Sequence, residues 1–474
     1  MENLLELLKT DPKKVVDAIR TKTKSTDEIA NYIKEYKEFD RDQRDGQIGK
    51  VQKDKPITSG NVSKMVKICL NHAENIVETL SAFIIGKPVT LIASEINDLD
   101  KLVKQTWRVN RIDSKILEAT ILKLSETQSA IQFYITDAGP MSLLNKVLVS
   151  VGLKTQAKEI KAKVLDNTKG TMTPYFDGRG DMIAFMWEYK SKVDEKDVNN
   201  VEIWDKEKYY FLNDVSGTLT NASKPLPHGF DRIPVVYDCQ DEPEWYKVKT
   251  LIDRHELALS KLGDANDYSG HPILVTEGEV ENMPLKSESG KHFNIPIKLG
   301  GDDGKTVVKG DVRFLEATTA PESNKLELDR LEDAISYGSG VANLSLDKLK
   351  ALGNVAEKTV KLMFLGTEIK ASLKQAATRT FIERCVNVIM SGITKTTNTA
   401  MAANGKSLYY DIQFNSILPS DMAETVGYLT DAVEGKVMSR KTAISILDVV
   451  DNEEEELRLI NEENKTEPVN DPVV

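Results

Sequence analysis

The pattern of hydrophobic and polar residues predicts helices on both sides of a central β region. Apolar residues recur every three or four positions over residues 61–85, 97–109, 114–126, 243–268, 324–342 and 356–391. Ser25 and Glu28 form a capping box that opens a shorter helix before them. Gly86-Lys87-Pro88 ends the helix over 61–85, because proline cannot continue the hydrogen-bond ladder.

Residues 127–240 change to the pattern of a mainly antiparallel β region. Segments 130–135, 182–189 and 209–212 are rich in β-branched and aromatic residues, and turn signals separate them. A second strand-like and glycine-rich stretch, residues 271–320, lies between the helices over 243–268 and 324–342. We therefore expect an α+β chain in which a helical hairpin carries a small β module at its tip.

Specific side chains are expected to pack the two helices of this hairpin. The first helix carries a heptad seam, and the second has apolar residues on one face. The predicted packing residues are Trp245, Val248, Ile252, Leu259, Leu331 and Ile335.

The C-terminal third of the chain is predicted to begin with the long helix over 356–391. Its expected buried side comprises Val360, Phe364, Ile369, Leu373, Ala376, Phe381, Cys385 and Ile389. A polar loop over 394–407 and a strand over 408–414 follow, and Ser420 and Ser439 are expected to cap two further helices. The acidic end of the chain is expected to be disordered.

Charge is distributed unevenly along the 474 residues. Lys and Arg number 63 and Asp and Glu number 74, so the net charge is −11. Residues 448–474 contain ten acidic and two basic residues, a net of −8, which leaves −3 for the rest. This balance excludes a protein whose whole surface clamps nucleic acid, since phosphate binding requires surplus Lys and Arg.

The motifs of common enzyme and metal sites are missing from the sequence. The stretch Gly300-Gly301-Asp302-Asp303-Gly304-Lys305-Thr306 lacks the first glycine of a phosphate-binding loop. The three cysteines and five histidines lack metal-ligand spacing. The apolar stretch 80–93 is broken by glycine and proline and is too short to span a membrane. We expect no catalytic residue, no metal, no cofactor and no membrane contact.

A cluster of lysines is the one positive signal for a ligand. Residues 345–361 carry Lys348, Lys350, Lys358 and Lys361 against two acidic residues, in a connector that runs into the long helix. Ordinary surface lysines are the plainer interpretation, and contact with phosphate groups is the functional one.

The order of elements resembles the portal proteins of tailed bacteriophages, in particular those of long-tailed siphophages of Gram-positive hosts. The resemblance covers residues 55–465 and rests on an ordered set of short motifs rather than on any single one. The motifs are Gly86-Lys87-Pro88-Val89, Tyr175-Phe176-Asp177 with Ile183-Ala184-Phe185, Gly229 to Val236, Leu251-Ile252-Asp253 with Leu257 to Ser260, Ile335 to Ala342, and Gly435 with Ser439 and Glu453 to Glu456. At Glu126 to Ser129 the sequence departs from the glycine-rich turn that is frequent in the family.

The resemblance implies a portal fold whose regions follow one another along the chain. These would be an N-terminal charged arm (1–55), a wing (56–240), stem helix 1 (241–270), a clip (271–320), stem helix 2 (321–343), a tunnel loop (344–355), a long wing helix with its loop (356–407) and a crown with an acidic tail (408–474). Lys348, Lys350 and Lys358 would then contact DNA from the tunnel loop and its border.

The implied function is a ring, of twelve subunits in the family, at one capsid vertex. Double-stranded DNA would be packaged and ejected through its channel without sequence specificity. The implied partners are the terminase large subunit, the major capsid protein, scaffold and a head-completion adaptor; the implied location is the virion, after assembly in the host cytoplasm. Two alternatives remain: another virion assembly protein, such as a capsid or scaffold component, and a metal-dependent nucleic-acid enzyme.

Overall fold

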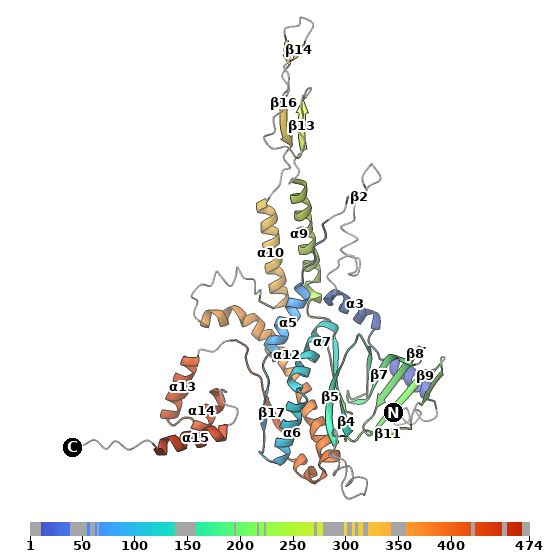
Figure 1. Cartoon of the computed structure of the whole chain (residues 1–474), viewed down its shortest axis with the longest axis vertical. Coiled ribbons are helices and arrows are strands. Elements are labelled where there is room, and N and C mark those ends of the chain that lie inside the picture. Colours follow the sequence, from blue (N-terminus) through green and yellow to red (C-terminus); the bar gives the residue numbers. More distant parts are fainter. Residues whose placement is uncertain are drawn as a thin grey trace, which may run out of the picture. The chain divides into compact units, whose positions relative to one another are not determined.

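A computed structural model covers the chain and confirms a mixed α+β architecture (Figure 1). The structure describes residues 11–37, 55–56, 62–63, 66–137, 158–193, 196–215, 218–221, 224–269, 273–277, 298–300, 306–308, 311–315, 321–342, 357–418, 422–447 and 453–466. The chain divides into two compact units. Unit 1 comprises Met1–Asn343 and Gly366–Asn415, and unit 2 comprises Leu344–Leu365 and Ser416–Val474.

Two antiparallel sheets form the β region of unit 1, as the sequence predicts. The small sheet has the order β12-β4-β5, and the large sheet has the order β10-β9-β8-β7-β6, with β11 pairing β9. The strands are β4 (Gln128–Asp137), β5 (Lys158–Leu165), β6 (Gly170–Phe176), β7 (Met182–Val193), β8 (Lys196–Trp204), β9 (Lys208–Val215), β10 (Thr218–Asn221), β11 (Leu226–Pro227) and β12 (Val235–Cys239).

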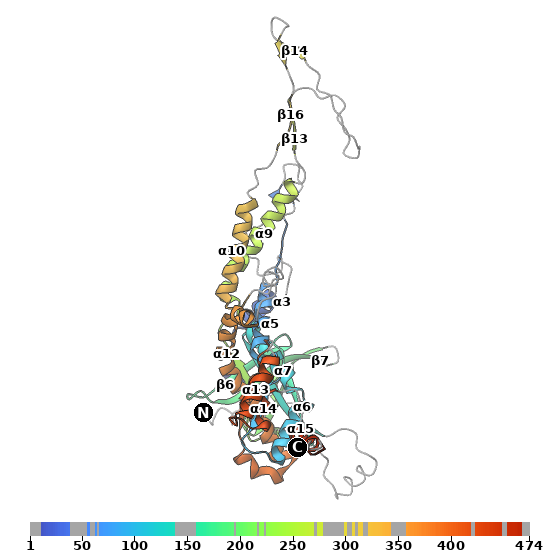
Figure 2. The ribbon, with the colours of Figure 1, turned by 90° about the vertical axis from the view of Figure 1, so that its left-hand side faces the viewer.

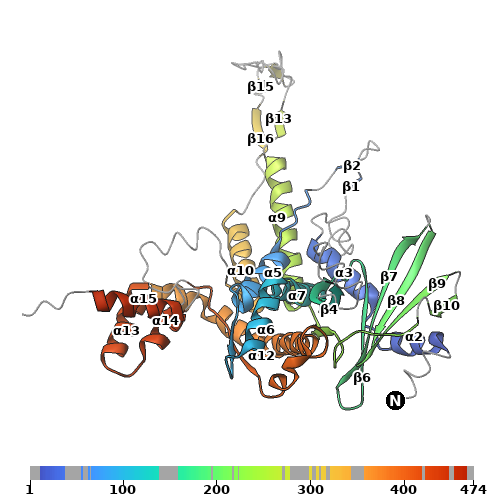
Figure 3. The same cartoon turned by 60° about the horizontal axis from the view of Figure 1, so that its bottom comes forward.

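The large sheet is covered on both faces. Alternate residues of its strands point to opposite faces, and each set of side chains packs in a separate core cluster. One face is covered by helix α2 (Pro12–Arg20), which lies beside the sheet in Figure 3. There Val15, Val16 and Ile19 pack with Ala184 and Met186. The other face packs against the small sheet, through Phe185, Trp187, Trp204, Ala130, Val235 and Tyr237. The region is therefore three-layered, with the large sheet in the middle.

Helices α3 (Thr26–Lys37), α5 (His72–Ile85), α6 (Asp98–Val109) and α7 (Ile112–Glu126) complete the N-terminal half. Ser25 is confirmed as the cap of α3, since its Oγ accepts a hydrogen bond from the Glu28 N–H at 3.3 Å. The prediction that one helix starts at Asn61 is wrong. Residues 62–63 form strand β2, paired with β1 (Lys55–Pro56), residues 66–70 are neither helix nor strand, and α5 begins only at His72.

The helical hairpin is present, with a 3₁₀ turn, η1 (Tyr246–Val248), before its first helix. Helix α9 (Lys249–Ser269) and helix α10 (Pro321–Ser339) lie side by side (Figures 1 and 2). Between them in sequence, β13 (Ile273–Glu277) pairs with β16 (Asp311–Leu315), and β14 (Lys298–Gly300) pairs with β15 (Thr306–Val308). The expected strand at 293–295 lies outside the described residues.

Helix α12 (Glu357–Gly392) confirms the long helix, but its buried side differs from the prediction. Phe364, Phe381, Cys385 and Ile389 are buried, whereas Ile369 and Leu373 are 56% and 75% exposed. Ala376 is also exposed, and the side chain of Val360 lies outside the described residues. The cause is that α12 carries apolar residues on two faces, so spacing alone does not identify the buried one.

Short helical turns, η2 (Ile393–Thr397), η3 (Thr399–Ala402) and η4 (Asn404–Lys406), replace the polar loop that the sequence predicts after α12. Strand β17 (Tyr410–Gln413) then pairs with β3 (Thr90–Ala93), so segments more than 300 residues apart join in unit 1.

Unit 2 contains α13 (Met422–Glu434), α14 (Arg440–Leu447) and α15 (Glu453–Thr466). Ser439 caps α14, since its Oγ accepts a hydrogen bond from the Thr442 N–H at 3.1 Å. Ser420 lies outside the described residues. The expectation of a disordered acidic end is wrong for residues 453–466, which are helical.

Candidate assembly interface

The base of the α9–α10 hairpin holds most of the predicted packing residues. Val248, Ile252 and Ile335 are buried, while Leu259 and Leu331 are half-buried. At Gly338 of α10 an added Cβ would lie 2.7 Å from Val248 Cγ1. Glycine at this position allows α10 to approach the turn η1, which contains Val248, this closely.

Trp245 packs against α3 as well as closing the start of the hairpin. Its ring stacks on Tyr36, with centroids 5.6 Å apart and planes at 18°, and its Nε1 donates to Glu35 Oε2 at 3.2 Å. Lys249 Nζ pairs with Glu35 Oε1 at 2.5 Å. The N-terminal helix α3 therefore anchors the root of α9.

An extended segment runs along α9 and is held by a regular set of hydrogen bonds that sequence analysis missed. The backbone N–H groups of Val66, Ile68 and Leu70 donate to Asp264 Oδ1, Ser260 Oγ and Glu256 Oε1, at 2.7, 3.0 and 2.8 Å. The donors recur every second residue of the segment and the acceptors every fourth residue of α9. These two spacings match, because two extended residues advance about 6.7 Å and four helical residues about 6 Å. The segment thus runs antiparallel to the helix.

The sequence signal for this contact is a stripe of side-chain acceptors four residues apart on α9. Glu256 and Ser260 are fully buried, which is unusual for a surface helix, and the backbone donors of the segment satisfy them. The next contact along is His72 Nε2 with His255 Nδ1, at 2.9 Å. Burial lowers the pKa of His255 despite the opposing charges of Glu332 and Glu256.

A second junction connects the hairpin to α12. The carboxylate of Glu244 is 7% exposed and pairs with Lys370 at 2.7 Å and Lys374 at 2.5 Å. Burial opposes its ionisation, but the two ammonium groups outweigh that effect and lower the pKa of Glu244. Lys370 Nζ also donates to the Ser339 carbonyl at 2.6 Å, so the end of α10 is fixed to the same point.

Thr367 completes this second junction. Its Oγ1 accepts a hydrogen bond from the Ala342 N–H at 2.9 Å. The backbone of Ala342, where the segment between α10 and α12 begins, is therefore hydrogen-bonded to α12. Lys348 and Lys350 belong to that segment and lie outside the described residues; Lys358 is in the first turn of α12, and its side chain is not described.

The exposed face of α12 forms an apolar stripe, which comprises Leu362, Leu365, Ile369 and Leu373. Their side chains are 68%, 47%, 56% and 75% exposed. Spacings of three, four and four residues put them on one side of the helix. Phe364, Thr367 and Ala371 are buried on the opposite side. A stripe of large exposed apolar residues over three turns is typical of a surface that another protein covers.

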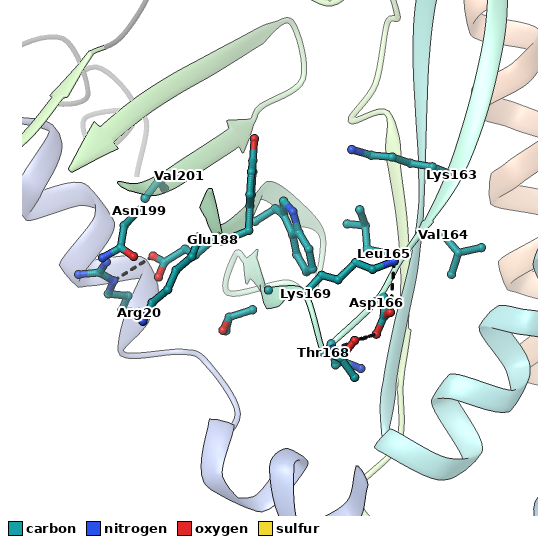
Figure 4. Close-up of a pocket in the computed structure, with 16 residues that line it drawn as sticks. Arg20, Lys163, Val164, Leu165, Asp166, Thr168, Lys169, Glu188, Asn199 and Val201 are labelled. Carbon is teal, nitrogen blue, oxygen red and sulfur yellow. Dashed lines mark hydrogen bonds and ion pairs between the residues drawn. The ribbon is translucent and has the colours of Figure 1, made fainter. Parts of the chain in front are cut away.

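A cavity of about 1160 Å³ lies where the turn between β5 and β6 meets β7 and β8 (Figure 4). Several of its charged groups are paired within it: Arg20 Nε with Glu188 Oε1 at 2.9 Å, and Lys169 with Asp166 at 3.6 Å. Burial opposes ionisation of Asp166, but hydrogen bonds from Thr168 outweigh it and lower its pKa. The Arg20–Glu188 pair therefore joins α2 to β7, and the contacts of Asp166 stabilise the turn itself.

No helix within the described part of the chain is long and apolar enough to cross a membrane.

Comparison with known proteins gives a curated relative and a match among solved structures. The portal protein of Bacillus phage SPP1 is 22% identical over 298 residues, which is 58% of this chain. The match spans 56% of that relative, little more than half of its length. Among solved structures, the neck of a native GTA particle, computed with C12 symmetry, matches with a TM-score of 0.37 and 11% identity, over 80% of this chain and 91% of that one.

A family model described as "Phage portal protein, SPP1 Gp6-like" matches residues 21–468 of the 474. The match includes both sheets, the helical hairpin, α12 and the helices of unit 2 through α15. The chain belongs to the SPP1 Gp6-like family of phage portal proteins.

Proposed function

We propose that this chain is one subunit of a closed ring, of twelve copies, at one vertex of a tailed-phage capsid. Double-stranded DNA passes through the channel of the ring during packaging and ejection. The role is structural, and the chain catalyses no reaction. Family membership supports this proposal, and the observation that carries it at residue level is the exposed apolar stripe of α12.

The stripe is proposed to contact the neighbouring subunit. Each of its four side chains leaves a large apolar area in water, and covering such area is the main driving force of protein association. In a ring each subunit contacts its two neighbours through two different surfaces. Such head-to-tail contacts form a closed ring when the rotation from one subunit to the next divides a full turn. The opposite face of α12 is buried within its own chain, so the stripe is available to a second copy.

The regions of the chain are assigned as the family resemblance implies. Residues 56–240 and the long helix with its loop (356–407) form the wing, residues 241–270 and 321–343 the stem, residues 271–320 the clip and residues 408–474 the crown. The clip docks the terminase large subunit and later the head-completion adaptor; scaffold and the major capsid protein surround the ring. The complex is assembled in the host cytoplasm and becomes part of the virion.

DNA contact is assigned to Lys348, Lys350 and Lys358, in and beside the tunnel loop over 344–355. The chain outside residues 448–474 has a net charge of only −3, which suits a conduit. A strongly basic lining would hold the duplex through counterion release, whereas a few lysines give weak contacts without sequence specificity.

Ring assembly of a double variant, Leu365→Asp with Ile369→Asp, tests the role of the stripe. The matched control is Val437→Asp, an apolar side chain that is 86% exposed in unit 2. Sedimentation velocity and negative-stain images should show rings for the parent and the control, and smaller species for the double variant. Rings of normal size from a folded double variant would contradict the interface.

The same measurements separate the alternatives. A capsid or scaffold component would not form rings of fixed order in purified form. A metal-dependent enzyme would show nuclease or ATPase activity with magnesium, which we expect to be absent.

A further inference from the structure

A second pocket, of about 580 Å³, lies between the small sheet and the edge of the large sheet and has no part in the proposed conduit. Its volume falls in the ~300–1,000 Å³ range of ligand pockets. The lining residues come from five strands, from the loop after β11 and from η2, and they include Gln132, Glu202, Trp204, Tyr209, His228 and Phe230.

Gln132 on β4 carries an unsatisfied hydrogen-bond acceptor in this pocket. The residue is only 6% exposed, and its Oε1 is buried without a hydrogen-bond partner. A buried amide oxygen without a partner is unfavourable, because the hydrogen bond that it made to water in the unfolded chain is not replaced. The pocket therefore favours a ligand that brings a hydrogen-bond donor.

Glu202 on β8 adds a second acceptor. The residue is 9% exposed, and its Oε1 accepts a hydrogen bond from the Tyr189 hydroxyl at 2.8 Å. No lysine or arginine in the described ranges forms an ion pair with it. Burial, and after it the charge of Glu202, raise the pKa of Tyr189 and of Tyr209, so both hydroxyls stay protonated. An acid buried without a cation attracts one.

The nearby ring of His228 does not supply that positive charge. Its Nδ1 accepts a hydrogen bond from the Phe230 N–H at 3.2 Å, so the ring proton is on Nε2, which donates to the Asp205 carbonyl at 3.1 Å. Burial lowers the pKa of His228, and the ring is neutral at pH 7. Lys158 and Asp137 also line the pocket, but they are exposed and are register partners at the end of β4 and β5.

The walls of the pocket are aromatic. Trp204 and Tyr209 have ring centroids 5.6 Å apart, and Tyr134 exposes 41% of its surface beside them. Aromatic faces attract cations, and guanidinium groups stack on them more often than ammonium groups do.

We propose that this pocket binds the guanidinium group of an arginine side chain presented by another polypeptide. The planar group with five N–H donors can reach the oxygens of Gln132 and Glu202 while it stacks on Trp204 or Tyr209. Leu226 and Pro227, which line the same pocket, offer apolar contact to the residues beside the arginine. The pocket is therefore a candidate docking point in unit 1 for an arginine-bearing partner.

Binding of short peptides to the full chain tests the proposal. The probe is the tripeptide acetyl-Gly-Arg-Gly-amide, compared by isothermal titration calorimetry with the lysine and citrulline tripeptides. We expect saturable binding of the arginine peptide, weaker binding of the lysine peptide and none of the uncharged citrulline peptide. Absence of saturable arginine binding, or equal binding of citrulline, would overturn the proposal.

Variants separate a binding role of Glu202 from a structural one. Glu202→Gln keeps an acceptor for Tyr189 and removes the charge, so it should weaken arginine binding at least about tenfold without lowering the melting temperature. Glu159→Gln is the control, because Glu159 is an exposed acid on β5 paired with Lys161. Gln132→Met should also weaken binding. Unchanged affinity in both pocket variants would exclude this pocket, and a lower melting temperature of Glu202→Gln would show that Glu202 is structural.

Discussion

The backbone N–H of Leu70 donates to the carboxylate of Glu256 on α9 at 2.8 Å, and Glu256 is completely buried. A peptide group and a helix side chain 186 residues away therefore satisfy each other in a place that water does not reach. Of the three bonds that hold the extended segment over 66–70, this one is nearest the start of α9.

Removing the acceptor at Glu256 should destabilise unit 1. Glu256→Ala leaves a buried N–H without a partner, and the expected loss is about 1–3 kcal/mol in the free energy of unfolding. Glu256→Gln retains a side-chain oxygen at the same place and should lose much less. Urea unfolding followed by circular dichroism compares the two; an equal loss in both would show that the charge rather than the hydrogen bond matters.

Two glycine-to-alanine changes should have opposite signs. Gly338→Ala puts a methyl group 2.7 Å from Val248 Cγ1, so we expect a loss of about 1–3 kcal/mol from overpacking. Gly366→Ala, within α12, meets no atom within 4 Å and should gain about 0.5–1 kcal/mol from helix propensity. Thermal unfolding of both variants checks the close approach in the hairpin, and a neutral Gly338→Ala would contradict it.

Acid should weaken the junction at Glu244. Its pKa in the folded chain is below the ordinary value of 4.5, so the pair with Lys370 and Lys374 stabilises the fold above about pH 4.5 and is lost as the pH falls through the lowered value. Glu244→Gln should therefore lose about 3 kcal/mol at pH 7, since it leaves two ammonium groups without their partner. The difference from the parent should shrink below pH 4.5. Urea unfolding at a series of pH values measures it, and a difference that is independent of pH would refute the ionic role.

Charge reversal of the tunnel-loop lysines should affect DNA and spare the ring. Lys348→Glu with Lys350→Glu is expected to impair packaging or retention of DNA, because acidic side chains repel phosphate. Ring size by negative stain is the control, and DNA content per particle is the readout. Unchanged DNA content would remove these residues from the channel contact.

Most of the secondary structure was predictable because each element depends mainly on the residues of its own segment. The strands that contain segments 130–135, 182–189 and 209–212, the hairpin helices and the cap at Ser25 each follow from local spacing or from one polar group. The segment over 66–71 was not, since Val66 and Cys69 have helical spacing by coincidence. Its conformation is decided by acceptors on α9 that lie almost two hundred residues further along the chain.

Residues at surfaces and pockets were harder to predict than the fold. The sequence offers Phe364 and Ile369 of α12 as equal candidates for burial, and only packing in three dimensions separates them. Gln132 and Glu202 are likewise ordinary members of alternating strands. Their shared pocket arises from the stacking of two sheets, which no spacing within either strand encodes.

The contact between residues 66–70 and α9 uses peptide groups on one side, which has an evolutionary consequence. The N–H donor at positions 66, 68 and 70 exists whatever side chain is present, with proline as the one exception among the twenty amino acids. Selection can therefore vary these three side chains without removing the hydrogen bonds, while the acceptors on the helix must be retained. We expect related chains to differ in the side chains of the extended segment over 66–70 and to share the acceptor residues at the positions of Glu256, Ser260 and Asp264 on α9.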